Sequence, residues 1–131
     1  MTDSQDLADE PLRWFPHDAD AAGDPKCRRL MRKTGAAGYG RWWLLCEALA
    51  SEPGHHISVK TATDLENLAV LLDLDCAEEA TEFIEDLLTV GLITSNDGFV
   101  SSPRMDANAE RSGKSKERSR RAAIARWSGQ K

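Results

Sequence analysis

The spacing of apolar residues, which changes along the sequence, is the feature that most limits the fold of this chain. Between residues 39 and 90 apolar side chains recur every three or four positions, the period of helices that bury one face. The apolar residues between 92 and 101 instead flank Asn96-Asp97-Gly98, whose Asp-Gly pair favours a tight hairpin. We therefore predict a mainly α fold with a small β-hairpin.

Capping residues predict where the first elements begin and end. Asp24-Pro25 reads as an N-cap followed by proline at the first helical position, so a helix is expected from there to about residue 33, ended by Gly35. A second helix should follow to about residue 50, with one ring of the Trp42-Trp43 pair pointing inward. Residues 57–59 are expected to form a short strand.

The second half of the chain carries similar signals. Residues 63–66 match a capping box that would begin the third helix, and Asp75 is predicted to cap a fourth helix that ends at Gly91. After the hairpin, Ser102-Pro103 predicts a further helix to about Arg111, which Gly113 should break.

The length and composition predict one folded domain. The chain has 131 residues, of which 40% are hydrophobic, enough for one compact core. We expect residues 14–111 to form this domain, after a flexible N-terminus at 1–13. Residues 112–131 form a basic C-terminal tail that can be helical but offers only Ile124 and Trp127 as apolar anchors, so we expect it to be mobile.

The order of the predicted elements is that of a winged helix, a helix-turn-helix pair followed by a hairpin. The segments WFPHDADAAGDPKCRRLMRKTGAAGYGRWWLLCEALA, VGLI, NDGFVSS and the basic tail with its ARW resemble the winged-helix N-terminal domain of phage replisome-organiser and replication-initiation proteins. The resemblance spans roughly residues 14–127. It implies a winged helix-turn-helix fold and a role in DNA replication on a mobile element, and it supplies no catalytic residues. Members of that family often continue into a second region, whereas this sequence stops at Lys131.

The formal net charge of −5 hides two opposing parts. Residues 111–131 hold eight basic side chains and one acidic, a net charge of +7, whereas residues 1–110 hold nine basic and 21 acidic, a net charge of −12. Phosphate affinity depends on local cation density, so the tail is the main candidate for binding a DNA backbone. Its candidate DNA-binding residues are Arg111, Lys114, Lys116, Arg118, Arg120, Arg121 and Arg126. Those of the body are Arg28, Arg29, Arg32, Lys33 and Arg41.

The helix predicted at residues 76–90 is acidic on its outer face. Its carboxylates fall within an arc of about 120° at 100° per residue. They are Glu78, Glu79, Glu82, Glu85 and Asp86. A helix-turn-helix would insert this helix into the major groove, where these carboxylates would repel phosphates. The face is therefore either a protein-interaction surface or a solvated helix face.

Motifs for catalysis, metals or cofactors are absent from the sequence. His17, His55 and His56 lack the spacing of zinc ligands, and His55 and His56 are expected in an exposed turn. The sequence contains no nucleophile elbow, Walker loop or dinucleotide-binding glycine run, so we predict neither an enzyme nor a cofactor site. The three cysteines read as core residues. The acidic N-terminus and the lack of a long apolar run predict a cytoplasmic protein without membrane contact.

Three functional hypotheses follow from these patterns. The leading one is a small, non-catalytic, replication-associated DNA-binding protein of a phage or mobile element, whose tail supplies most of the phosphate affinity. The alternative is an acidic protein-interaction module, a phage inhibitor or nucleic-acid mimic, that acts on a host replication protein or other DNA-handling machine. A third is a homodimer formed through an exposed aromatic side chain or the edge of the hairpin, which is the wing of a winged helix. The basic tail could also fold back onto the acidic body.

Overall fold

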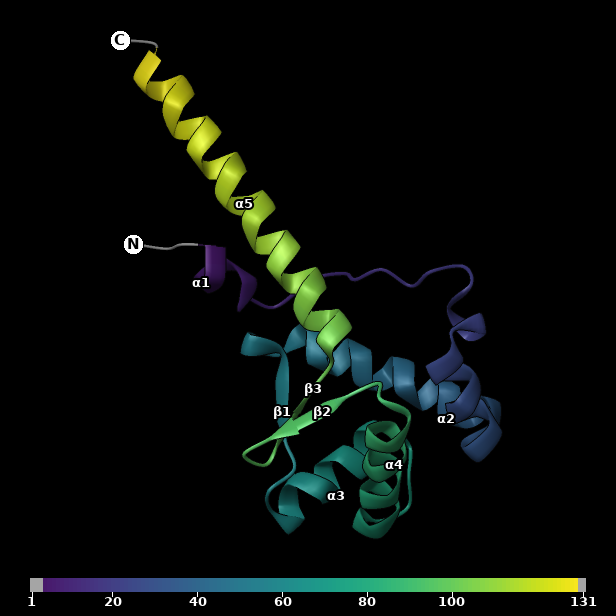
Figure 1. Ribbon diagram of the computed structural model, residues 1–131. Helices are drawn as coiled ribbons and strands as arrows, with labels where there is room; N and C mark the ends of the chain where they lie inside the picture. Colours follow the sequence, from purple (N-terminus) through teal and green to yellow (C-terminus); the bar gives the residue numbers. More distant parts are fainter. Residues whose placement is uncertain (1–3, 130–131) are drawn as a thin grey trace.

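The computed structural model describes residues 4–129 and is mainly helical, with a small antiparallel sheet (Figure 1). The elements in chain order are α1 (Ser4–Ala8), η1 (Ala21–Gly23), α2 (Pro25–Ser51), η2 (Pro53–His55), β1 (His56–Ser58), α3 (Ala62–Leu71), α4 (Ala77–Val90), β2 (Thr94–Asn96), β3 (Phe99–Ser101) and α5 (Pro103–Gly129). The predicted fold class, mainly α with a small β-hairpin, is confirmed.

Helix α2 contains the first two helices that the sequence predicts. The Asp24 carboxylate accepts hydrogen bonds from the backbone N–H groups of Lys26 and Cys27, as expected of an N-cap before Pro25. Gly35 has φ 72° and ψ −173°, so the helical path is interrupted there, as predicted. The left-handed φ favours glycine at this break.

The caps of α3 and α4 differ from the prediction by one or two residues. The capping box of α3 joins Thr61 and Asp64, not residues 63 and 66. The Asp64 carboxylate also accepts a hydrogen bond of 2.6 Å from the Ser58 hydroxyl. This bond, together with those from Thr61, lowers the pKa of Asp64. Cys76, not Asp75, is the N-cap of α4, and the Asp75 N–H donates to the Glu79 carboxylate.

The predicted hairpin, β2 and β3, is joined by β1 in a three-stranded sheet with strand order β1-β3-β2. Asp97 and Gly98 both have positive φ, which a tight hairpin turn requires. Strand β1 pairs with β3 in the register His56↔Ser101, and a bond from the Val59 N–H to the Gly98 carbonyl continues this pairing toward the turn. Helix α4 ends at Gly91, whose φ of 86° is left-handed, as predicted.

The core lies between α2, α3, α4 and the sheet. Its largest fully buried apolar side chains are Leu30, Leu45, Leu49, Leu72, Leu87 and Val100. Trp42 points inward and is 4% exposed, whereas Trp43 is only half-buried and stacks on His17, with ring centroids 3.5 Å apart. One ring of the adjacent pair therefore enters the core, as expected for neighbours on a helix.

The prediction of a loose N-terminus is wrong for the residues that the structure describes. Helix α1 lies against α5, and Ala8 is buried (Figure 1). The segment after α1 is tied to the body by backbone bonds, from the Gly54 N–H to the Asp9 carbonyl and from the Leu12 N–H to the Ala50 carbonyl. These contacts join residues that are far apart in the sequence, so the local spacing of apolar residues does not predict them.

The predicted break at Gly113 is also wrong, because α5 is one continuous helix through this position. A Cβ on Gly113 would lie 2.4 Å from the Ser4 carbonyl oxygen and 2.7 Å from the Ala8 nitrogen. Glycine is needed here for the close approach of the α1 backbone, not to end a helix. The predicted tail is therefore helical, and the 27 residues of α5 extend over about 40 Å. Among residues 4–129, no helix combines the length and the apolarity that a membrane span needs.

Two glycine-to-alanine substitutions should have opposite effects. Gly40 lies in α2, and a Cβ added to it would have no neighbouring atom within 4 Å, so Gly40→Ala should stabilise the protein by about 0.5–1 kcal/mol through helix propensity. Gly113→Ala gains the same propensity but collides with the α1 backbone, so we expect faster proteolysis between residues 4 and 10. Thermal melts and limited proteolysis of both variants check this, and an undisturbed α1 in Gly113→Ala would contradict the close approach.

Candidate nucleic-acid interface

Four predicted cations form a row on the outward face of α5. Arg111, Lys114, Arg118 and Arg121 fall within an arc of about 80° at 100° per residue, and all four are exposed. Gly113 and Ala109, which face α1 and the core, lie on the other side of the helix. Figure 1 shows the second half of α5 extending away from the body. We call these four residues the cationic row.

Local contacts hold the cationic row in place without neutralising all of it. Lys114 pairs with Glu110 at 3.6 Å, and Arg121 pairs with Glu117 at 2.7 Å, each one helical turn away. Arg111 donates a hydrogen bond to the side-chain oxygen of Asn108. Ion pairs between exposed side chains contribute at most about 1 kcal/mol, so a phosphate can replace either carboxylate.

The other predicted cations of the tail lie off this row. Lys116 and Arg120 are on the side of α5 nearer to α1, and Lys116 pairs with Glu10 at 3.4 Å. Arg126 is exposed near the end of the helix, and Lys131 lies outside the described residues. The structure therefore divides the basic tail into an outward face and a face turned toward the N-terminal segment.

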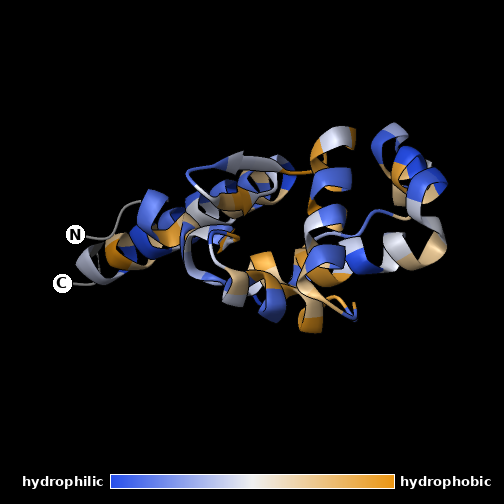
Figure 2. Ribbon diagram, turned by 90° about the horizontal axis from the view of Figure 1, so that it is seen from below, coloured by the Kyte–Doolittle hydropathy of each residue, from blue (hydrophilic) through white to orange (hydrophobic). Residues whose placement is uncertain are grey.

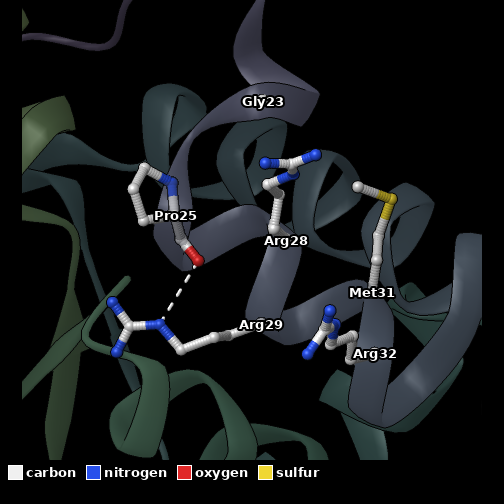
Figure 3. Close-up of a pocket in the computed structure, with 6 residues that line it drawn as sticks. All are labelled: Gly23, Pro25, Arg28, Arg29, Met31 and Arg32. Atoms are coloured by element: carbon white, nitrogen blue, oxygen red, sulfur yellow. Dashed lines mark hydrogen bonds between the residues drawn. The ribbon is translucent and has the colours of Figure 1, made fainter.

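A second group of cations lines a hollow of about 520 Å³ at the beginning of α2 (Figure 3). Arg28, Arg29 and Arg32 surround it, together with Gly23, Pro25 and Met31. The Nε atom of Arg29 donates to the Pro25 carbonyl at 3.3 Å, which leaves its terminal nitrogens at the surface. This part of α2 and the end of α5 lie at opposite ends of the molecule in both ribbon views (Figures 1 and 2).

Lys33 and Arg41 are not part of that group. Lys33 pairs with Asp86 of α4 at 3.2 Å. The Nε atom of Arg41 donates to the Leu72 carbonyl at 3.0 Å, where it satisfies the backbone at the end of α3. Both side chains have a structural partner within the body.

The acidic residues of α4 divide in the same way. Glu78, Glu82 and Glu85 are exposed, whereas Glu79 accepts the bond from the Asp75 N–H and Asp86 pairs with Lys33. We call the three exposed carboxylates the acidic row. Because α4 contains no basic residue, this row would meet a phosphate backbone with unbalanced negative charge.

Arg104 and Trp14 join the basic surface although no pattern in the sequence pointed to them. They line a groove of about 940 Å³ between residues 10–18 and α5, together with Arg111 and Lys116. Arg104 forms an ion pair with Asp18, and the Trp14 side chain is 76% exposed. The seven-residue spacing of Arg104 and Arg111 can be read from the sequence, but only a continuous α5 places them on one face.

The expectation that both His55 and His56 lie in an exposed turn is wrong for His55, which is only 2% exposed. Its ring nitrogens contact two backbone carbonyl oxygens, Nδ1 that of Leu49 at 2.9 Å and Nε2 that of Ala8 at 2.8 Å. His55 therefore joins the segment after α1 to the end of α2. Within residues 4–129, no three side chains of the metal-binding types gather into a site.

Comparison with known families shows a match over more than two-thirds of the chain. Residues 14–105 match the domain described as Lin1244/Lin1753-like, N-terminal. The chain belongs to the Lin1244/Lin1753-like N-terminal family. Searches of curated proteins and of solved structures gave no match. The family region contains the whole body from Trp14 to the first turn of α5, while the cationic row lies beyond it.

Proposed function

We propose that this chain is a non-catalytic nucleic-acid-binding protein that contacts the phosphate backbone through α5. The observation that carries the proposal is the cationic row, four exposed cations on one face of a helix that extends beyond the body. Replication of a phage or mobile element, in the cytoplasm, is the process that the sequence resemblance suggests for it.

The geometry of α5 suits a run of phosphates. The cationic row runs from Arg111 to Arg121, about 15 Å along the helix, and three of its four members are arginines. Arginine binds phosphate oxygens in a bidentate manner, and a rigid helix loses less conformational entropy on binding than a disordered tail. Such contacts position a protein on DNA without reading bases, so the expected sequence specificity is weak.

The body would serve as a scaffold. We infer a winged helix-turn-helix from the order α2, β1, α3, α4 and the β2–β3 hairpin. In that fold α4 would be the helix offered to the major groove, but its acidic row disfavours insertion. Trp14 lies beside Arg104 and Arg111 in the groove at the beginning of α5, where an exposed ring could stack on an unpaired base.

Two matched triple substitutions test this proposal. Arg111, Arg118 and Arg121 are changed to glutamine in one variant, and Arg28, Arg29 and Arg32 in the other. Binding to fluorescent duplex and single-stranded DNA is measured by anisotropy between about 50 and 300 mM salt. If four to six cations contact phosphates, the wild-type slope of log affinity against log salt is about −4 to −5. The α5 variant should flatten this slope by about 2.7 and weaken binding at least about tenfold at low salt, since three contacts are lost.

The triple variant of α2 is the control, because it loses the same charge from the opposite end of the molecule. A smaller effect of this variant supports α5 as the main contact. Equal or larger loss in the α2 variant would overturn the proposal in favour of the hollow at Arg28, Arg29 and Arg32. Substitution is preferable to deletion of residues 111–131, because deletion also removes Gly113, against which α1 packs.

A second candidate function is an acidic protein-interaction module. It is favoured by the exposure of Glu78, Glu82 and Glu85 on a helix without basic residues. In this case the acidic row binds a basic surface of another protein, and charge reversal of these three residues would abolish the contact.

A further inference from the structure

The end of α5 carries two large apolar side chains that nothing within residues 4–129 covers. Ile124 is 58% exposed and Trp127 is 76% exposed. At about 100° per residue they continue the face on which Ala109 is buried and Gly113 meets α1. The face that packs against α1 at Gly113 is therefore exposed at Ile124 and Trp127.

The continuous helix keeps this tip away from its own body. A flexible tail of net charge +7 could fold back onto a body of net charge −12, but a rigid helix through Gly113 points the tip outward (Figure 1). Beyond residue 113, Lys114, Lys116 and Arg121 pair with Glu110, Glu10 and Glu117, all close to the helix itself. The end of α5 and helix α4 lie at opposite ends of the molecule (Figure 1), so this tip can meet an acidic row only on another copy.

The acidic row of α4 is the surface of another copy that complements this tip. Leu88 is 37% exposed and follows Glu85 by three residues, so it borders the acidic row at Glu85. An apolar side chain bordered by carboxylates matches an apolar pair bordered by cations. Pairing two α5 helices with each other would instead bring like charges together, which costs free energy.

We propose that this protein self-associates head to tail, with the α5 tip of one copy docked on the acidic row and Leu88 of the next. Ile124 and Trp127 supply the apolar contact, and Arg126 approaches Glu78, Glu82 and Glu85. Such an interface joins two different surfaces, so it does not close in a dimer, and the mean mass rises with concentration.

This inference does not depend on nucleic-acid binding. The cationic row and the apolar face of the tip are about 130° apart around α5, so the helix can offer one face to phosphates and the other to a second copy. Self-association is measured without DNA, so a monomeric protein would overturn this inference and leave the proposed function intact. Loss of DNA binding would likewise leave this inference intact.

The first test uses two tryptophans of equal exposure. Trp127 and Trp14 are each 76% exposed, but Trp14 lies in the groove at the base of α5. Sedimentation velocity of the wild type should show a mean mass that rises with protein concentration and falls between about 50 and 500 mM NaCl. Trp127→Ala should raise the dissociation constant at least about tenfold, and Trp14→Ala should leave it within about twofold. A wild type that stays monomeric, or equal effects of the two variants, would overturn the proposal.

The second test is complementation between two defective proteins. One has Glu78, Glu82 and Glu85 changed to lysine and keeps its α5 tip, and the other has Ile124→Ala and Trp127→Ala and keeps its acidic row. Each alone should be monomeric, whereas their mixture should form a 1:1 complex that grows no further, because only one intact interface is available. No complex in the mixture would contradict head-to-tail docking, as would normal assembly of the charge-reversed variant alone.

Discussion

Replacing His55 with alanine is expected to lower the free energy of unfolding by about 2–5 kcal/mol and to release α1 from α5. The ring is 2% exposed, and both of its nitrogens contact carbonyl oxygens, of Leu49 and of Ala8. Without the ring these carbonyls remain buried and unsatisfied, and each costs about 1–3 kcal/mol. The effect reaches α1 because Ala8 is its last residue.

The two carbonyls that the ring contacts belong to different elements, that of Leu49 to α2 and that of Ala8 to α1. Asp106 of α5 lies near enough to sense this site, since burial raises the pKa of its carboxyl while His55 and His56 lower it. His55 thus joins α1 and the end of α2 beside the base of α5.

A second substitution at this position separates the ring from the backbone. His55 has φ 55°, a left-handed value that asparagine tolerates better than alanine does. If the hydrogen bonds of the ring matter, His55→Asn should lose nearly as much stability as His55→Ala in urea titrations followed by tryptophan fluorescence. Hydrogen exchange at residues 4–10 should rise sharply in both. Full recovery in His55→Asn would show that the backbone, not the ring, sets the stability.

The parts of the fold that the sequence predicts are those set by neighbouring residues. Gly35 and Gly91 take left-handed φ values where a helical path is interrupted or ends. The hairpin turn likewise requires positive φ only at Asp97 and Gly98. The apolar period of α4 likewise places Phe83 and Leu87 inside without knowledge of their partners. Local chemistry decides these features, so a single sequence suffices.

The features that the sequence does not predict depend on partners far along the chain. Gly113 has the local appearance of a helix breaker, but its role is set by Ser4 and Ala8, more than 100 residues earlier. His55 resembles an exposed turn residue until Ala8 and Leu49 surround it. Both errors concern the same contact, the return of the N-terminal segment to the base of α5.

The contact between α1 and α5 also determines how the cations of the candidate site are arranged. Composition alone indicates the cations of the tail, but their division into an outward row and an inward face requires α5 to continue through Gly113. Arg104 escapes prediction for the same reason, since its seven-residue spacing from Arg111 has meaning only on one helix. The α1–α5 contact turns a basic tail into a rigid surface with two distinct faces.

Thiol reactivity should separate the three cysteines by orders of magnitude. Burial raises the pKa of the Cys46 thiol to about 12 and also raises that of Cys27, and both side chains are 3% exposed. The thiolate is the reactive species, so at pH 8 only about one Cys46 in 10⁴ is ionised. Cys76 is half-buried at the beginning of α4. Iodoacetamide should therefore label Cys76 first and Cys46 at least about 10³ times more slowly, as read by mass spectrometry of peptides.

In concentrated urea the three rates should converge, because unfolding removes the burial that protects Cys27 and Cys46. Rapid labelling of Cys46 in the native protein would contradict its burial in the core, on the inner face of α2.

The same measurement gives a control for the charge variants of α5. If Cys46 remains protected in the variant with Arg111, Arg118 and Arg121 changed to glutamine, its body is folded. Weaker DNA binding by that variant then reflects the loss of cations and not the loss of structure.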